Sequence, residues 1–299
     1  MAEDMHFLPR SKVLSIEEML RVAQLFTELG VTKIRVTGGE PLIRKGVDTL
    51  MEGLGQLDGL RELAITTNGS QLASKSESLR LAGVSSVNIS IDSLQRERFR
   101  TITRIGALDK VLNGIQSAIE SGFPKIRLNV VIMDGFNRDE VLPLLDFAIQ
   151  NKISIAFIEE MPLGQVNIAG KSLAFVASDE LIDEVSLHHS LEPAASAETA
   201  GPAREFFVRG TKTRIGFISP HTNNFCATCN RLRVTAEGRL LLCLGNEHSL
   251  DLRKIIRGNA SDETIKSAII AAVGFKPERH VFDQPDRPQI MRFMNATGG

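Results

Sequence analysis

Apolar and polar positions along the first 160 residues alternate between short strand-like runs and longer helix-like segments. Short apolar runs predict strands at 33–37, 63–66, 86–91, 126–132 and 153–158. Between them, helical periodicity and stop signals predict helices near 15–29, 46–57, 72–82, 94–101, 107–121 and 137–150. Strands that alternate with helices over short connections require right-handed crossovers, so the pattern predicts an α/β fold with a parallel sheet.

The alternation of predicted strands and helices ends after Pro162. We expect a glycine-containing loop over 163–177, then a short helix that Ser178 caps, and a surface loop over 192–204. Further along, the pattern predicts two hairpins and then two helices, with hairpin turns at 209–210 and 236–238 and helices near 250–257 and 261–273. This change of pattern divides the chain into a region of βα units, 1–162, and a C-terminal module, 163–299.

Composition excludes several classes of protein. The chain has 299 residues and a net charge of −1, which does not indicate a nucleic-acid-binding surface. No run of eighteen apolar residues is present, so no membrane span is expected. Its three cysteines lie close together, which fits metal binding in a reducing compartment better than a disulfide framework. We therefore expect a cytoplasmic protein, or one of an organelle matrix.

The cysteines form a pattern typical of a metal or cluster site: Cys226-x2-Cys229, then thirteen intervening residues, and then Cys243. Three interpretations stay open on spacing alone. The thiolates can hold structural zinc together with His221 or His248, they can hold an iron–sulfur cluster with one iron open to a ligand, or they can bind nothing. No nucleophile elbow or catalytic triad pattern accompanies them, so no catalytic residue is assigned.

Two arginines follow the cysteine pair directly. In a strand, alternation places Arg231 and Arg233 on one face, with Leu232 between them on the other. Guanidinium groups bind phosphate in a forked geometry. The sequence therefore indicates a bound anion, such as a phosphate-bearing ligand, beside the cysteine site.

Polar residues gather where the predicted parallel strands end, which is the edge at which α/β folds build their sites. Gly38-Gly39 allows either a tight turn or close approach of a ligand, and Glu40 can receive an ammonium group. Ser90 and Asp92 can hold a ribose or ammonium group, or cap the next helix. Met161 can line a pocket or be plain core.

Arg35 and Arg127 lie within otherwise apolar strands. A charged residue in such a place needs a partner. Each therefore forms a structural ion pair or binds substrate phosphate.

Six motifs in chain order resemble the radical S-adenosylmethionine GTP 3',8-cyclase family of molybdenum-cofactor biosynthesis. They are Gly38-Gly39-Glu40-Pro41, Thr67-Asn68-Gly69, Asn88 to Ser93, Phe157 to Pro162, Phe225 to Arg233 with Cys243, and the Gly298-Gly299 tail. The resemblance covers essentially the whole chain. It implies an incomplete (βα)6 TIM-like barrel of the radical SAM type with a C-terminal Fe–S cluster module. It also implies radical cyclisation of GTP to (8S)-3',8-cyclo-7,8-dihydroguanosine 5'-triphosphate.

Site residues follow from the resemblance by matching motif. Contacts to S-adenosylmethionine are expected from Gly39, Ser90 and Met161. Contacts to GTP are expected from Arg35, Thr66, Arg127, Arg231, Leu232 and Arg233. Ligands of the C-terminal 4Fe-4S cluster are expected to be Cys226, Cys229 and Cys243. The diglycine tail, Gly298-Gly299, resembles one that reaches back toward the active site, although Thr297 replaces an apolar residue usual before the glycines.

The resemblance departs at the front of the chain. The family carries a Cys-x3-Cys-x2-Cys motif for a second, radical-generating 4Fe-4S cluster, whereas this sequence has no cysteine before Cys226. The ligands of that cluster are therefore expected to be missing here. The further partners that the resemblance implies are an electron donor and a second copy of the chain in a homodimer.

Overall fold

The computed structural model describes residues 8–161, 167–168, 171–172, 174–194, 201–223, 225–244 and 248–278. They belong to two compact units. The first unit draws on 1–65, 78–84 and 226–299, and the second on 66–77 and 85–225. The predicted division after residue 162 separates sequence patterns rather than these spatial units, and it stays a prediction.

The first unit begins with a strand pair and the helices beside it. Helix α1 (Ile16–Glu28) starts with the expected capping box, in which Ser15 and Glu18 bond each other's backbone N–H groups. Strand β1 (Lys33–Val36) then pairs in parallel with β2 (Glu62–Thr67). Helix α2 (Val47–Gly55) lies between them in sequence and packs beside α1. The parallel pair with an intervening helix is the βα unit that the pattern predicts.

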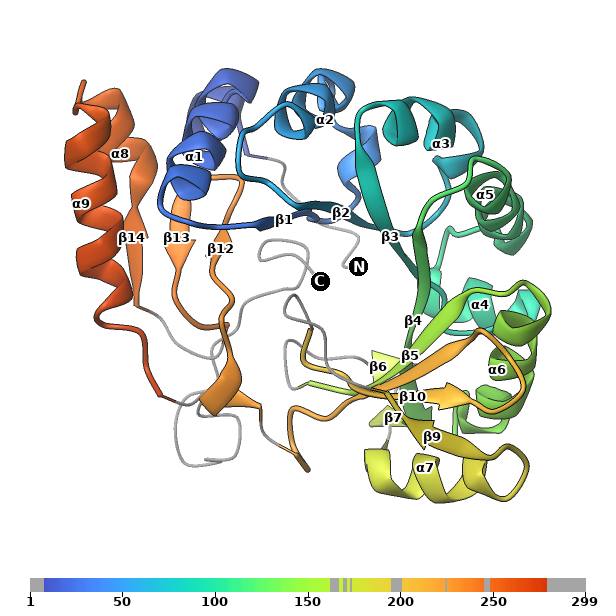
Figure 1. Cartoon of the computed structure of the whole chain (residues 1–299). Coiled ribbons are helices and arrows are strands. Elements are labelled where there is room, and N and C mark those ends of the chain that lie inside the picture. Colours follow the sequence, from blue (N-terminus) through green and yellow to red (C-terminus); the bar gives the residue numbers. More distant parts are fainter. Residues whose placement is uncertain are drawn as a thin grey trace. The chain divides into compact units, whose positions relative to one another are not determined.

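The rest of the first unit comes from the C-terminal part of the chain. Strands β12 (Arg233–Val234), β13 (Arg239–Leu241) and β14 (Ser249–Asp251) form an antiparallel sheet. Helices α8 (Leu252–Arg257) and α9 (Asp262–Val273) follow, and Figure 1 shows both beside α1 and this sheet. One apolar cluster joins these elements; its buried members are Val22, Leu25, Phe26, Leu240, Leu242, Leu252, Ile256, Ile265 and Ile269.

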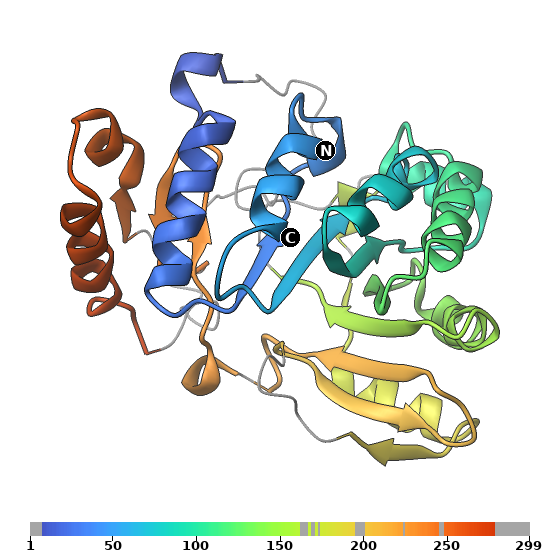
Figure 2. The same cartoon turned by 45° about the horizontal axis from the view of Figure 1, so that its top comes forward.

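The second unit is built on a mixed sheet. Strands β3 (Val84–Ser90), β4 (Lys125–Asp134), β5 (Ser154–Glu159) and β11 (Arg214–Ile218) run parallel in that order. Strands β10 (Arg204–Val208) and β9 (Leu191–Pro193) then continue the sheet antiparallel, as Figure 2 shows for the β9–β11 region. The hairpin of β10 and β11 has the turn predicted at 209–210. The parallel strands confirm the predicted α/β fold class.

Helices cover one face of the parallel strands. They are α4 (Arg96–Thr103), α5 (Leu108–Glu120) and α6 (Val141–Gln150), which lie on the same side of β3–β5 in Figure 1. Strand β4 shows the consequence for its side chains: Ile126, Leu128 and Val130 are buried, whereas Arg127 and Asn129 are only partly buried. Because successive strand residues point to opposite faces, the two polar residues lie on the face away from these helices.

Some local predictions differ from the structure. Short strands β6 (Asn167–Ile168), β7 (Lys171–Ser172) and β8 (Ala174–Phe175) occur where a loop is predicted. Ser178 is the first residue of α7 (Ser178–Ser186) rather than its cap, and its N–H bonds the Glu159 carboxylate instead. Helix α3 (Leu72–Leu81) ends near Gly83 as expected. The predicted surface loop at 192–204 begins with β9, and its residues 195–200 lie outside the described residues.

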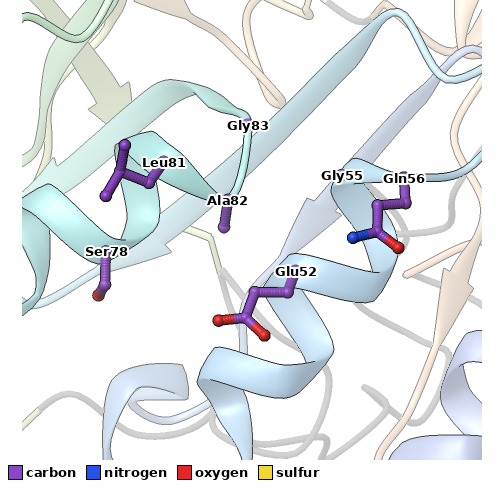
Figure 3. A pocket seen from close by; sticks show the side chains of 7 residues that line it. All are labelled: Glu52, Gly55, Gln56, Ser78, Leu81, Ala82 and Gly83. Carbon is purple, nitrogen blue, oxygen red and sulfur yellow. The ribbon is translucent and has the colours of Figure 1, made fainter.

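The backbones of α2 and the turn after α3 approach very closely in the first unit. A Cβ atom added to Gly55 would lie 1.9 Å from the carbonyl oxygen of Ala82. Figure 3 shows the pocket beside this contact, with Glu52 and Gln56 on one side and Ser78 and Leu81 on the other. Its volume is about 310 Å³. Glycine is required at position 55 because only a residue without a side chain fits between these two segments.

We therefore predict that Gly55→Ala lowers the free energy of unfolding by about 1–3 kcal/mol, the usual cost of overpacking. Replacing glycine by alanine within a helix normally raises the free energy of unfolding by about 0.5–1 kcal/mol. The direction of the change in stability therefore tests the close contact. Urea denaturation followed by circular dichroism measures it. The control is Gly201→Ala, because nothing lies within 4 Å of a Cβ there. A Gly55→Ala protein as stable as this control would contradict the close approach.

Candidate functional site

The cysteine pair lies on a single tight turn in the first unit. A 3-10 turn covers Cys226–Thr228, and the Cys229 N–H donates to the Cys226 carbonyl over 3.1 Å. Cys243 comes two residues after β13. All three cysteines are partly buried, and none of them forms a disulfide. We call residues 226–233 the cysteine segment.

Positive charge surrounds the sulfur of Cys229. Burial raises the pKa of this thiol, but the N–H and guanidinium of Arg231 and the ammonium of Lys276 outweigh it, so the pKa lies below its ordinary value. The Lys276 Nζ is 3.7 Å from the Cys229 sulfur. A thiolate is the form that binds metals, and nearby cations are the usual way to stabilise it.

Arg233 shares this environment. Burial and the neighbouring charge of Arg231 lower its pKa to about 10, while the sulfurs of Cys229 and Cys243 act in the opposite direction. Arg233 is therefore still charged at neutral pH and within electrostatic reach of two of the three cysteines. Arg231 lies two residues before β12, so the strand begins later than the alternation argument for Arg231 and Arg233 assumes. Leu232 packs against the apolar cluster, as alternation predicts.

Among the residues that the structure describes, no three Cys, His, Asp or Glu side chains come together in a group that could hold a metal ion. The predicted convergence of all three sulfurs is thus not seen in this part of the chain. The donor chemistry nevertheless fits an iron–sulfur cluster. Two cysteines share one turn, the pKa of Cys229 is lowered, and Arg233 interacts electrostatically with the sulfurs of Cys229 and Cys243. His221, a zinc ligand in one interpretation, instead places its Nε2 2.9 Å from the Glu160 carbonyl in the second unit.

The strand-end residues of the first unit lie near β1. Arg35 is a partly buried residue within this strand, and Gly39 is exposed just beyond it. Glu40 accepts a hydrogen bond of 3.0 Å from the Leu42 N–H and so caps the 3-10 turn Pro41–Ile43. This cap is a structural role for Glu40, alongside the ammonium contact that the sequence suggests.

A second group of polar residues lies on the sheet of the second unit, on the face away from α4–α6. The register places Ser90 beside Asn129, and Asn88 beside Arg127. Ser90 is exposed, whereas the Asn129 Oδ1 is buried without a hydrogen-bond partner in the described part of the chain. A buried acceptor without a donor is costly unless a ligand or water supplies one. Ser90 and Asn129 are therefore candidate contacts for a hydroxyl-bearing ligand.

Arg127 forms the ion pair that one of its two interpretations requires. Its guanidinium bonds the Glu205 carboxylate on β10, and Arg214 on β11 reaches the same carboxylate over 3.3 Å. All three residues lie in the second unit. A structural partner for Arg127 is thus confirmed, while its contact to GTP stays a prediction.

The end of β5 is fixed by one carboxylate. Glu159 is 2 % exposed, and it accepts hydrogen bonds from the N–H groups of Ser178, His221 and Thr222 and from the Thr222 hydroxyl. Burial raises the pKa of Glu159, but these donors outweigh it and lower the pKa overall. Met161 lies two residues beyond and is partly buried. The network therefore holds the strand end from which Met161 extends.

Thr66 is buried at the C-terminal end of β2, with 8 % of its surface exposed. The predicted site residues that the structure describes thus form two groups, one in each unit. Cys226, Cys229, Cys243, Arg231, Leu232, Arg233, Arg35 and Gly39 belong to the first, and Thr66, Ser90, Arg127 and Met161 belong to the second.

Sequence reasoning missed two residues that the structure brings to these groups. Asn129 follows Arg127 at strand spacing, so alternation alone could have placed it beside the site. Lys276 lies 47 residues from Cys229, and no local pattern links the two.

Asp92 follows β3 in the second unit, and its carboxylate accepts a hydrogen bond from the Val131 N–H over 2.9 Å. Burial raises the pKa of Asp92 from 3.8 to about 6, against the opposing effect of this bond. Because the folded-state pKa is raised, the protonated form stabilises the fold fully below pH 3.8, and this contribution is lost as the pH rises through 6. Stability at neutral pH is thus reduced by an ionised Asp92.

We predict that Asp92→Asn removes this loss, since an amide oxygen can still accept from Val131 and carries no charge. The unfolding free energy of the variant relative to the native protein should rise from about pH 4 to pH 7, by about 1–3 kcal/mol. Urea denaturation at several pH values measures this difference. Asp134→Asn, at the exposed end of β4, is the control. A pH-independent difference for Asp92→Asn would contradict the assignment.

Comparison with known proteins gives two family matches. Residues 2–148 match the Radical SAM superfamily, and residues 153–282 match Molybdenum Cofactor Synthesis C. A helix long and apolar enough to cross a membrane is not found in the described ranges of the chain.

Curated relatives match along the whole chain. A GTP 3',8-cyclase of Marinobacter nauticus is 53 % identical over 100 % of this chain and 90 % of its own length. GTP 3',8-cyclase 1 and GTP 3',8-cyclase 2 of Pseudomonas aeruginosa are 54 % and 51 % identical, again over 100 % of this chain, and over 91 % and 90 % of their own lengths.

A solved structure shares the fold. SuiB of Streptococcus suis, bound to S-adenosylmethionine, matches with a TM-score of 0.63 and 17 % identity, covering 98 % of this chain and 70 % of SuiB. At this identity the match supports the α/β fold of radical SAM enzymes alone. The identity to the cyclases over the whole chain confirms the family that the motifs indicated: this chain belongs to the GTP 3',8-cyclase family.

Proposed function

We propose that this chain acts in molybdenum cofactor biosynthesis, in the radical cyclisation of GTP to (8S)-3',8-cyclo-7,8-dihydroguanosine 5'-triphosphate. The observation that carries the proposal is the identity of 53 % and 51 % to proteins named GTP 3',8-cyclase over the whole chain. The radical SAM superfamily implies a 4Fe-4S cluster and S-adenosylmethionine. When bound, these groups supply the radical that starts the cyclisation.

In this proposal Cys226, Cys229 and Cys243 hold the C-terminal 4Fe-4S cluster. The lowered pKa of Cys229 supports it, because ligand thiols bind as thiolates. Three protein thiolates leave one iron open to a ligand.

The guanidiniums of Arg231 and Arg233 would bind the triphosphate of GTP. Their mutual repulsion is part of what lowers the pKa of Arg233, and a bound phosphate would offset it. Such a concentration of cations is tolerated more readily at a binding site than elsewhere. Further contacts to GTP are proposed for Leu232, Arg35, Thr66 and Arg127.

S-adenosylmethionine would be bound by Gly39, Ser90 and Met161. The exposed Ser90 and the buried Asn129 Oδ1 beside it support a ribose site, since ribose hydroxyls can donate to that oxygen. We further propose that the chain has two functional parts, a partial barrel at 1–162 and a cluster module at 163–299. The two family matches support this division, because one ends at residue 148 and the other begins at residue 153. The diglycine tail lies outside the described residues.

The reaction also needs an electron donor, and a homodimer would be compatible with it. We place the protein in the cytoplasm or an organelle matrix, because its cysteines are not in disulfides and thiolate ligands need a reducing compartment.

A second candidate is GTP and cluster binding without turnover. The favouring observation is that all three cysteines of this sequence are assigned to one cluster, which leaves no thiolate among them for a second cluster that generates radicals. An anaerobic assay of the reconstituted chain with GTP, S-adenosylmethionine and a reductant separates the candidates. Cyclised product supports catalysis by this chain, whereas GTP binding without product supports the second candidate. Absence of both contradicts the proposal.

Iron and sulfide analysis tests the cluster site itself. After anaerobic reconstitution we expect about four irons and four sulfides per chain, as one cubane cluster requires. Cys226→Ser and Cys229→Ser should each lose most of this iron, because one of three protein ligands is gone. Ser186→Ala, at the exposed end of α7 in the second unit, is the control for losses during handling. Zinc bound in place of iron would contradict the cluster and favour a structural metal site.

The phosphate contact is tested by Arg233→Gln. Loss of a charged donor to phosphate is worth about 1.5–3 kcal/mol, so the dissociation constant for GTP should rise roughly 10-fold to 150-fold. Equilibrium dialysis of the reconstituted protein measures it. Arg209→Gln is the control, because the Arg209 side chain is 73 % exposed and pairs with Glu192 in the second unit. Equal GTP affinity in the Arg233 and Arg209 variants would rule out the proposed triphosphate contact.

A further inference from the structure

Lys276 connects the segment after α9 to the cysteine segment. Its Nζ donates to the carbonyl oxygen of Cys229 over 2.6 Å and to that of Arg231 over 3.1 Å. The same atom lies 3.7 Å from the Cys229 sulfur. An ammonium group has three donors. All three of these contacts are therefore to one short stretch of backbone and to its sulfur.

The position of Lys276 follows from the way α9 ends. Beyond the helix, the N–H of Phe275 donates to the Ala272 carbonyl and the N–H of Lys276 to the Val273 carbonyl, both over 2.9 Å. The chain therefore stays close to the last turn of α9 up to this lysine. Lys276 is partly buried, which fits a side chain directed toward protein rather than solvent.

Helix α9 is itself anchored along its length. Ile265 and Ile269 belong to the apolar cluster of the first unit. At the start of the helix, Asp262 pairs with Arg21 of α1 over 2.6 Å. These contacts anchor α9 within the first unit, and Lys276 follows three residues after the end of this helix.

The contacts of Lys276 hold the backbone on both sides of Asn230. The carbonyls of Cys229 and Arg231 converge on one cation, which fixes the turn between the second cysteine and the arginine run. Hydrogen bonds to a charged donor contribute more to stability than neutral ones do. This single side chain therefore restrains the conformation that the cysteine segment adopts.

We propose that Lys276 is a positioning residue for the cysteine segment: its ammonium fixes the backbone from Cys229 to Arg231 and places a positive charge beside the Cys229 sulfur. The second half of this inference rests on the proposed function, because the charge acts on a cluster bound at that sulfur. The first half concerns the protein alone.

The charge has a defined consequence for electron transfer. Reduction adds negative charge to a cluster, and a nearby cation stabilises the reduced form more than the oxidised form. Net charge and hydrogen bonds to the sulfurs are among the factors that set cluster potentials. Lys276 therefore raises the reduction potential of a cluster ligated by Cys229.

Three variants test the proposal. Lys276→Met removes the charge and the donors while keeping an unbranched side chain, and Lys276→Arg keeps a charged donor. Lys266→Met is the matched control, because Lys266 is also a partly buried lysine of this region but pairs with Glu28 and Glu263. Circular dichroism of each cluster-free protein first establishes that it is folded.

The first measurement is hydrogen–deuterium exchange of the peptide that covers the cysteine segment, in the protein without iron. We expect faster exchange in Lys276→Met, and native exchange in Lys276→Arg and Lys266→Met. Exchange in Lys276→Met that equals the control would overturn the positioning role. This measurement needs no cluster, so it tests the positioning role even in a protein that binds no iron. Failure of the native chain to bind iron would count against the proposed function and not against the positioning role.

The second measurement uses the reconstituted protein. Loss of a supporting contact to a metal ligand typically costs 10-fold to 100-fold in metal affinity, so Lys276→Met should release iron to a chelator roughly 10 times faster than the native protein. Its cluster should also have a lower midpoint potential in a redox titration followed by electron paramagnetic resonance, and Lys276→Arg should restore it. An unchanged potential in Lys276→Met would overturn the electrostatic role.

Discussion

The cysteine site depends on the apolar contact between α1 and the C-terminal elements of the first unit. Phe26 and Leu25 of α1 are buried with Leu240 and Leu242 of the β13 region and with side chains of α8 and α9. Burying one such side chain contributes about 1.5–3 kcal/mol. This packing joins residues that are more than two hundred positions apart in sequence. The cysteine segment is anchored to them because its Leu232 packs against the same cluster.

This core also orients the polar residues that adjoin it. Leu242 is buried in the cluster, and Cys243 is its immediate neighbour. Leu232 packs against the same cluster, and Arg231 and Arg233 flank it. Packing of the two leucines fixes the backbone beside the cysteine and the arginines, although only Arg233 of these residues lies in a strand, β12.

Much of the fold could be predicted because its elements carry local signals. The capping box at Ser15 and the hairpin turn at Arg209-Gly210 depend only on residues a few positions apart. By contrast, the Arg127–Glu205 pair joins residues 78 positions apart. Ser178 has the composition of an N-cap, but the buried Glu159 carboxylate bonds its N–H, so a tertiary contact replaces the local one. Such contacts depend on the packing of whole elements, which residue spacing does not encode.

Prediction of the candidate site from sequence has a related limit. The family was evident from short motifs, yet the convergence of three cysteines expected from spacing is not seen among the described residues. A metal or cluster supplies the bonds that draw its ligands together, so ligand spacing predicts the chemistry better than the geometry of the protein without its metal. Lys276 was missed because it lies 47 positions from Cys229 and reaches it only through the docking of α9.

Mössbauer spectroscopy of the protein reconstituted with ⁵⁷Fe tests most directly whether Cys226, Cys229 and Cys243 ligate an iron–sulfur cluster with one iron open to GTP. We expect the spectrum of a 4Fe-4S cluster in which one iron differs from the rest and changes its signal when GTP is added. A spectrum that contains no cluster iron, or one that GTP leaves unchanged, would contradict this assignment.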